Sequence, residues 1–193
     1  MEPRIADIAN RIRTLREDAE IAPEQMSEVV GISLADYIAL EAGEQDPTFT
    51  VLYRTAEKLG VDIVDLLTGE GPHLTGYSVA RAGTGLLMKR RAGFEYRHLA
   101  PHFRDKLAEP FVVTAPFSAA EQDAPIALSR HVGQEIDYVL TGQLRFAFDG
   151  HTEILDPGDS VYYDSGRGHG MIATGGEPCT FLAIVLKHPA ESL

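Results

Sequence analysis

The sequence predicts a two-domain α+β protein, with a small all-α domain followed by a larger all-β domain. In residues 1–67 the apolar side chains recur every three or four positions, which is the spacing of helices. In residues 79–193 they form short or alternating runs separated by glycine and proline, which is typical of an antiparallel sheet. Residues 68–78 contain three glycines and one proline, and we expect a linker there.

Composition places the chain among ordinary globular proteins. It has 193 residues, of which 44% are hydrophobic and 24% are charged. No apolar run approaches the roughly 18 residues of a membrane span, and the N-terminal segment lacks the apolar stretch of a signal peptide. Cys179 is the single cysteine, so no internal disulfide can form. We therefore expect a cytoplasmic protein with no membrane partner.

Acidic residues are concentrated in the first part of the chain. The net charge is -12, and residues 1–70 contain 6 basic against 15 acidic residues. An acidic surface repels phosphate backbones, which disfavours strong non-specific binding of nucleic acid.

The predicted helices near residues 25–43 form a pair joined by a tight turn. Gly31 follows the first helix and permits the turn. Ser33 starts a capping pattern, so the second helix is expected to begin at about Leu34. Gly43 suits the left-handed position after its end. This arrangement is typical of a helix-turn-helix.

The stretch from "EQMSEVVGISLADYIALEAGEQ" onward resembles the XRE, or lambda-repressor-like, helix-turn-helix family over about residues 5–67. The resemblance implies that residues 33–42 form a recognition helix for double-stranded DNA, that the protein is a homodimer, and that Arg16 pairs with Glu41. The expected DNA-contacting residues are Gln25, Ser33, Leu34, Ala35, Asp36 and Tyr37.

An alternative is a helix-turn-helix that serves folding, dimerisation or shielding of a partner domain. Base reading relies on Arg, Lys, Asn or Gln at the exposed start of the recognition helix. This helix has leucine, alanine, aspartate and tyrosine there. Fold alone does not decide between the two functions.

The segment 129–142 contains an unusual row of polar residues. On an extended strand, Ser129, His131, Glu135, Asp137 and Val139 would share one face, subject to any bend at a glycine within the segment. The opposite face would be apolar. The ordinary interpretation is that the polar face meets solvent and the apolar face meets the core.

The same segment, ending in "YVLTG", and the later "PGD" with a following histidine resemble the two motifs of the cupin family. The resemblance covers about residues 111–187 and implies a double-sheet jelly-roll barrel. It also implies a divalent metal, namely Fe, Zn, Mn or Ni, held by His131, Glu135 and His169, with Ser129 in place of a fourth ligand. The alternative is a metal-free barrel in which the histidines only form hydrogen bonds.

A further resemblance is to hydroxypropylphosphonic acid epoxidase, an iron enzyme that also joins a helix-turn-helix to a cupin. That resemblance implies that Tyr96 lies near the metal and the ligand. It also places Glu20 where the enzyme has a substrate-binding lysine, which disfavours a phosphonate.

Two functions follow from these resemblances. The first is a DNA-binding transcriptional regulator whose cupin domain senses a small-molecule ligand, with a bound divalent metal. The second is a mononuclear non-haem iron oxygenase or epoxidase that acts on a small anionic substrate and keeps the helix-turn-helix as a scaffold.

Overall fold

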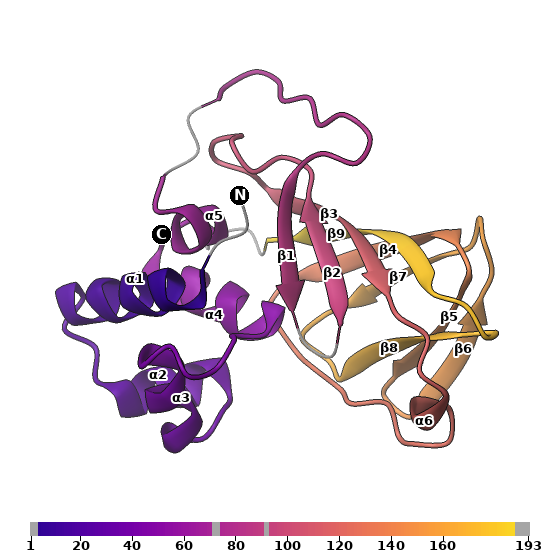
Figure 1. Cartoon of the computed structure of the whole chain (residues 1–193), viewed down its shortest axis with the longest axis horizontal. Helices are drawn as coiled ribbons and strands as arrows, with labels where there is room; N and C mark the ends of the chain where they lie inside the picture. The colour runs from indigo at the N-terminus through magenta and orange to yellow at the C-terminus, as the bar shows by residue number, and fades with distance from the viewer. Residues whose placement is uncertain (1–3, 71–73, 91–92, 188–193) are drawn as a thin grey trace. The chain divides into compact units, whose positions relative to one another are not determined.

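The chain folds into a helical unit and a β unit (Figure 1). The computed structural model describes residues 4–70, 74–90 and 93–187. The helical unit comprises Met1–Ser78 and Pro101–Asp105, and the β unit comprises Val79–Ala100 and Lys106–Leu193. Residues 101–105 group with the helical unit because Phe103 forms a parallel bridge with Leu74. The two-domain α+β fold predicted from the sequence is confirmed.

The helical unit contains five helices among the described residues. They are α1 (Ile5–Asp18), α2 (Pro23–Val30), α3 (Leu34–Glu41), α4 (Phe49–Leu59) and α5 (Ile63–Thr68). The predicted helix pair is present as α2 and α3. Gly31 between them has φ 74°, and the Ser33 hydroxyl accepts a hydrogen bond from the Asp36 amide. Gly43, just after α3, has φ 76° as expected.

The helical core is built from the apolar stripes of all five helices. The side chains with 3% exposure or less are those of Ile8, Ile12, Met26, Val30, Tyr37, Leu40, Leu52, Ile63, Val64, Leu66 and Leu67. In the longer helices they recur at three- and four-residue intervals, so each of these helices turns one face toward the core. Burial of these side chains stabilises the unit.

The β unit is made of two antiparallel sheets. Its elements are β1 (Leu86–Arg90), β2 (Phe94–His98), β3 (Ala108–Ala115), the short α6 (Ala119–Gln122), β4 (Gln134–Thr141), β5 (Gln143–Phe148), β6 (His151–Leu155), β7 (Ser160–Asp164), β8 (His169–Thr174) and β9 (Cys179–Leu186). One sheet has the order β1-β2-β3-β9-β4-β7, and the other has the order β6-β5-β8. This double-sheet arrangement is consistent with the predicted jelly-roll.

The interior of the β unit follows from strict alternation along β3 and β9. In both strands every second side chain is buried. Phe111 and Val113 on β3 lie directly opposite Ala183 and Phe181 on β9, so they share the inner face. The outer side chains of these strands are half-buried. The strands thus form an inner wall of the β unit.

No helix in the described parts of the chain is both long enough and apolar enough to cross a membrane. The expected linker, residues 68–78, includes residues 71–73, which lie outside the described residues. Its first residue, Thr68, is the last residue of α5.

Candidate functional site

Three buried side chains that can bind a metal come together inside the β unit. His131 precedes β4, Glu135 lies near the start of β4, and His169 begins β8. One ligand atom from each residue lies within 4.8 Å of the other two. Strands from both sheets therefore bring together the three residues that the cupin resemblance singled out.

The geometry around these residues leaves imidazole nitrogens facing the cluster. The Nε2 of His131 is 3.0 Å from Oε2 of Glu135. The two imidazole rings are 5.1 Å apart and nearly perpendicular. His169 Nδ1 is 2.9 Å from the carbonyl oxygen of Arg167, which can only accept a hydrogen bond. His169 is therefore protonated on Nδ1, and its Nε2 lone pair is available.

Ser129 lies beside the cluster, where the cupin pattern has a fourth ligand. Its hydroxyl is 3.4 Å from Nε2 of His169, and the two residues form an isolated antiparallel bridge. A hydroxyl is a poorer ligand than an imidazole for a soft or borderline metal. The site is thus a three-residue donor set with a polar neighbour.

Burial makes His169 suitable as a neutral ligand. Removal of the imidazole from water lowers the pKa of His169 below its ordinary value, and the nearby His131 acts in the same direction. The hydrogen bond to Arg167 and the charge of Glu135 oppose this shift. A neutral imidazole is the form that binds metal ions.

The polar face of β4 points inward, so the ordinary interpretation of the segment was wrong. Glu135, Asp137 and Val139 are buried, whereas Tyr138 and Leu140 on the opposite face are 43% and 44% exposed. The reason is the partner of the strand, because β9 presents its inner face to the same side. The polar side chains gather in the interior, and the outer face of the strand is apolar.

A second carboxylate lies on the same face, two residues after Glu135. Asp137 is fully buried, and its Oδ2 accepts a hydrogen bond of 3.1 Å from the hydroxyl of Tyr163. Burial, followed by the charge of Glu135, raises the pKa of Asp137 well above its ordinary value. Burial and the neighbouring carboxylates also raise the pKa of Tyr163. The strand pattern predicted that Asp137 shares a face with Glu135, but it predicted no role for Tyr163. The hydrogen bond between Tyr163 and Asp137 joins residues 26 positions apart, so no local pattern reveals it.

The donor set fits a divalent metal ion. Two imidazoles and one carboxylate form the facial set that binds non-haem iron(II) and leaves positions open for other ligands. The site is buried, the donor atoms converge, and a backbone carbonyl orients His169. Zinc, manganese and nickel are compatible with the same donors.

Tyr96 lies on β2 in an aromatic group with two phenylalanines. Its ring stacks on Phe94 at 6.3 Å and meets the edge of Phe111 at 6.1 Å. Through the strand register, Tyr96 falls level with Val139, four residues along β4 from Glu135. It lies on the inner side of the sheet, at a different level from the donor set.

The expected DNA-contacting residues lie at the α2–α3 surface, with one exception. Gln25, Ser33, Ala35 and Asp36 are exposed, and Leu34 is half-buried. Tyr37 is fully buried in the helical core, so its side chain is not available at the surface. Hydrogen bonds from Ser33 and Gln45 lower the pKa of Asp36. The exposed start of α3 thus carries one carboxylate and no basic side chain.

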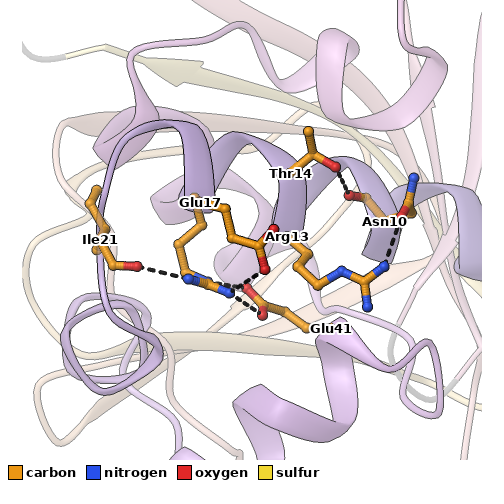
Figure 2. Close-up of polar contacts among 7 residues, drawn as sticks. Asn10, Arg13, Thr14, Glu17, Ile21 and Glu41 are labelled. Carbon is orange, nitrogen blue, oxygen red and sulfur yellow. Dashed lines mark hydrogen bonds and ion pairs between the residues drawn. The ribbon is translucent and has the colours of Figure 1, made fainter.

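Three basic residues of the helical unit bind other parts of that unit. Arg16 pairs with Glu41, and its NH1 donates to the carbonyl of Ile21 (Figure 2). Arg11 donates to two carbonyls at the end of α5, and Arg54 donates to the carbonyl of Val30 at the end of α2. These contacts satisfy helix ends that lack partners of their own. Composition cannot reveal them, because they depend on the packing of distant helices.

The α2–α3 region is markedly acidic. Residues 17–53 contain nine Asp or Glu and no Lys or Arg. Among residues 4–68, the exposed basic side chains are those of Arg4, Arg13 and Lys58. Any binding of DNA by α3 therefore depends on neutral hydrogen-bonding groups and backbone amides rather than on a basic surface.

Two family models match the two parts of the chain. The model of the helix-turn-helix domain matches residues 9–72, and the model of the cupin domain matches residues 119–185. The chain is a helix-turn-helix protein with a cupin domain. All three donor residues lie within the matched part of the cupin domain. No curated protein matches the sequence.

Solved structures with the same arrangement are similar over nearly the whole chain. A transcriptional regulator of the HTH_3 family from Vibrio cholerae shares 21% identity over 97% of this chain and 98% of that chain, with a TM-score of 0.67. Hydroxypropylphosphonic acid epoxidase from S. wedmorenis shares 20% identity over 96% of this chain and 100% of that chain, with a TM-score of 0.51. The structure of FeII HppE shares 22% identity over 95% and 100% of the two chains, with a TM-score of 0.50. At these identities the likeness establishes the fold of this cupin protein.

Proposed function

We propose that this cupin protein is a transcriptional regulator whose barrel binds a divalent metal ion and a small molecule. The convergence of His131, Glu135 and His169 in the barrel carries the proposal. The two imidazoles and the carboxylate would hold the ion, and the ion would supply open positions for a ligand. The surrounding inner faces of β3 and β9 would exclude water. Tyr96, on the inner side of β2, is a proposed contact of the ligand.

The helix-turn-helix domain is the proposed DNA-binding part. The name of the Vibrio cholerae protein, a transcriptional regulator, supports this assignment. We propose contacts from Gln25, Ser33, Leu34, Ala35 and Asp36, and we leave out the buried Tyr37. We also propose membership of the XRE family and a homodimer, because a two-fold operator requires paired recognition helices. A protein that acts on DNA in this way would work in the cytoplasm.

Ligand binding would regulate DNA binding through a coupling of the two sites. A ligand can change DNA affinity only by binding the two conformations of the protein with different free energies. Linkage then requires that DNA change ligand affinity by the same factor.

Selection from random duplex DNA is the most direct test of the proposed regulator function. The full-length, metal-loaded protein would be used at low salt, because the acidic helices weaken attraction to phosphates. We expect a discrete palindromic motif. Ala35→Glu, which adds a charge at the exposed start of α3, should abolish binding to that motif. Ala19→Glu, which adds the same charge at the exposed end of α1, is the matched control and should retain binding. Failure to enrich any motif would contradict the proposal that the protein is a transcriptional regulator.

A second function is favoured by the acidic α2–α3 region together with the donor set. Residues 17–53 lack any basic side chain, as expected if the helical domain is a scaffold rather than a DNA reader. Non-haem iron oxygenases use two histidines and one carboxylate. If this function is correct, the iron(II)-loaded protein should take up oxygen when its substrate is added, and Glu135→Ala should prevent that uptake. A protein that enriches a DNA motif and takes up no oxygen would exclude this alternative.

A further inference from the structure

A polar pair lies beside the donor set without belonging to it. The hydroxyl of Tyr163 donates to Oδ2 of Asp137 in the interior of the barrel, where the two side chains are 5% and 0% exposed. Both strands that carry them, β4 and β7, are well-paired parts of the six-stranded sheet. An apolar pair of similar size would pack there without a buried carboxyl group.

One atom of this pair has no hydrogen-bond partner. Among the described residues, nothing bonds to Oδ1 of Asp137, although the side chain is fully buried. A buried polar atom without a partner destabilises the folded state. In a native protein such an atom calls for a specific role, such as contact with a bound water, ion or reacting group. Oδ1 of Asp137 is therefore available for a ligand.

The strand register places the pair directly against the metal donors. Asp137 follows Glu135 by two residues and so lies on the same face of β4. Tyr163 lies opposite Glu135 in the pairing of β4 with β7, and its ring is 4.9 Å from the ring of His169. On the other side of Asp137, the neighbour in β9 is Ala183, whose side chain is only a methyl group. A small molecule bound at the metal would thus lie next to Oδ1.

We propose that Asp137 and Tyr163 form the hydrogen-bonding end of the ligand site and select a small metal-binding ligand that carries a hydroxyl group. This inference rests on the proposed metal and ligand binding of the barrel. The metal ion held by the three donors would bind one end of the ligand, and Oδ1 of Asp137 would bind the hydroxyl. Tyr163 acts as a positioning residue, because its hydrogen bond to Oδ2 fixes the orientation of the carboxyl group.

A hydroxyl fits this position better than a charged group. An anionic group at Asp137 would face the negative charge of Glu135 two residues away. A hydroxyl is neutral and can donate as well as accept, so it can pair with either form of a carboxyl group. It also satisfies the buried oxygen without bringing another charge into the barrel.

Matched pairs of small acids test the selection. The full-length protein is loaded with Zn²⁺, and loading is measured before ligand is added. Affinities are then compared for lactate against propionate and for 3-hydroxybutyrate against butyrate. The variants are Tyr163→Phe and the double variant Asp137→Leu with Tyr163→Phe. Tyr162→Phe is the control, since it removes a hydroxyl from the 56% exposed neighbour of Tyr163.

We expect the wild-type protein to bind the hydroxylated member of at least one pair about tenfold more tightly, the preference of one good hydrogen bond. The double variant should lose most of that preference, because both hydrogen-bonding side chains are absent. Tyr163→Phe should weaken it, and Tyr162→Phe should retain it. Zinc affinity should stay within about threefold in all variants, because the three donors are unchanged.

The inference would be overturned by an unchanged preference in the zinc-loaded double variant, by no preference in the wild-type protein, or by no binding of either pair. Loss of zinc from the double variant would also overturn it, since the pair would then serve the metal site alone. Failure of the wild-type protein to bind zinc is a separate outcome that counts against the proposed function itself.

Discussion

Arg16 and Glu41 form a two-point ion pair in the helical domain, with Nε 2.6 Å from Oε1 and NH2 2.9 Å from Oε2 (Figure 2). Both side chains are 9% exposed. The hydrogen bond to Glu41, more than any other contact, raises the pKa of Arg16. The pair joins α1 to the end of α3 and confirms the expectation from the sequence.

We predict that Arg16→Met destabilises the protein by about 3–5 kcal/mol, because it leaves the carboxylate of Glu41 buried without its partner. The double variant Arg16→Met with Glu41→Leu should recover much of the loss. Arg13→Met is the control, because Arg13 is exposed and its loss should change stability by less than about 0.5 kcal/mol. Urea unfolding curves measure all three, and equal stability of the Arg16 and Arg13 variants would contradict the prediction.

The second prediction concerns Glu109 on β3. Its Oε2 is 2.7 Å from Nε2 of His98, and its Oε1 is 2.8 Å from Nζ of Lys187. The backbone amide of Ala100 donates to His98 Nδ1, so the proton of the neutral ring is on Nε2 and is donated to Glu109.

Glu109→Leu should therefore destabilise the protein by about 3–5 kcal/mol, because it leaves buried polar groups without their hydrogen-bond partner. The matched control is Glu95→Leu, which breaks a partly exposed pair with Arg97 and should cost less than about 1 kcal/mol. Thermal or urea unfolding distinguishes the two. Similar losses for both variants would show that the buried cluster contributes nothing beyond a surface pair.

The third prediction concerns the reactivity of Cys179. Burial raises the pKa of its thiol to about 11. At pH 8 the native thiol should react with a disulfide reagent far more slowly than in the unfolded chain. Because the folded state holds the proton more tightly, stability from this group is complete below pH 9 and is lost as the pH rises toward about 11. A native-state reaction as fast as that in denaturant would contradict burial of the thiol.

The fourth prediction compares two glycines with positive φ. Gly142, between β4 and β5, has φ 73°, and an added Cβ would clash with the carbonyl of Pro178 and lie 2.9 Å from Cα of Cys179. Gly150 has φ 85° but nothing within 4 Å of an added Cβ. Gly150→Ala should cost about 1–2 kcal/mol for the backbone alone. Gly142→Ala should cost about 1–3 kcal/mol more, and equal losses in urea unfolding would refute the packing argument.

Local patterns in the sequence predicted much of the fold. The turn at Gly31, the cap at Ser33 and the start of α3 depend on neighbouring residues, and the structure confirms them. The positions of His131, Glu135 and His169 came from the motif resemblance, and the structure brings these residues together.

Features that depend on distant contacts could not be predicted in this way. Tyr37 was expected at the DNA surface, but the packing of neighbouring helices buries it. Strand alternation alone left open whether the polar face of β4 meets solvent, and only its pairing with β9 shows that this face lies in the interior. The hydrogen bond between Asp137 and Tyr163 likewise requires the pairing of β4 with β7.

The most direct test of the account is a titration of the metal-free protein with Co²⁺, followed by its visible spectrum and by calorimetry. We predict one ion per chain, and a loss of affinity of at least about tenfold in His131→Ala and in Glu135→Ala, because each variant removes a donor. His151→Ala, which removes an exposed histidine of β6, should bind like the wild-type protein. Absence of Co²⁺ binding, or equal affinity in all three variants, would contradict a metal site at His131, Glu135 and His169.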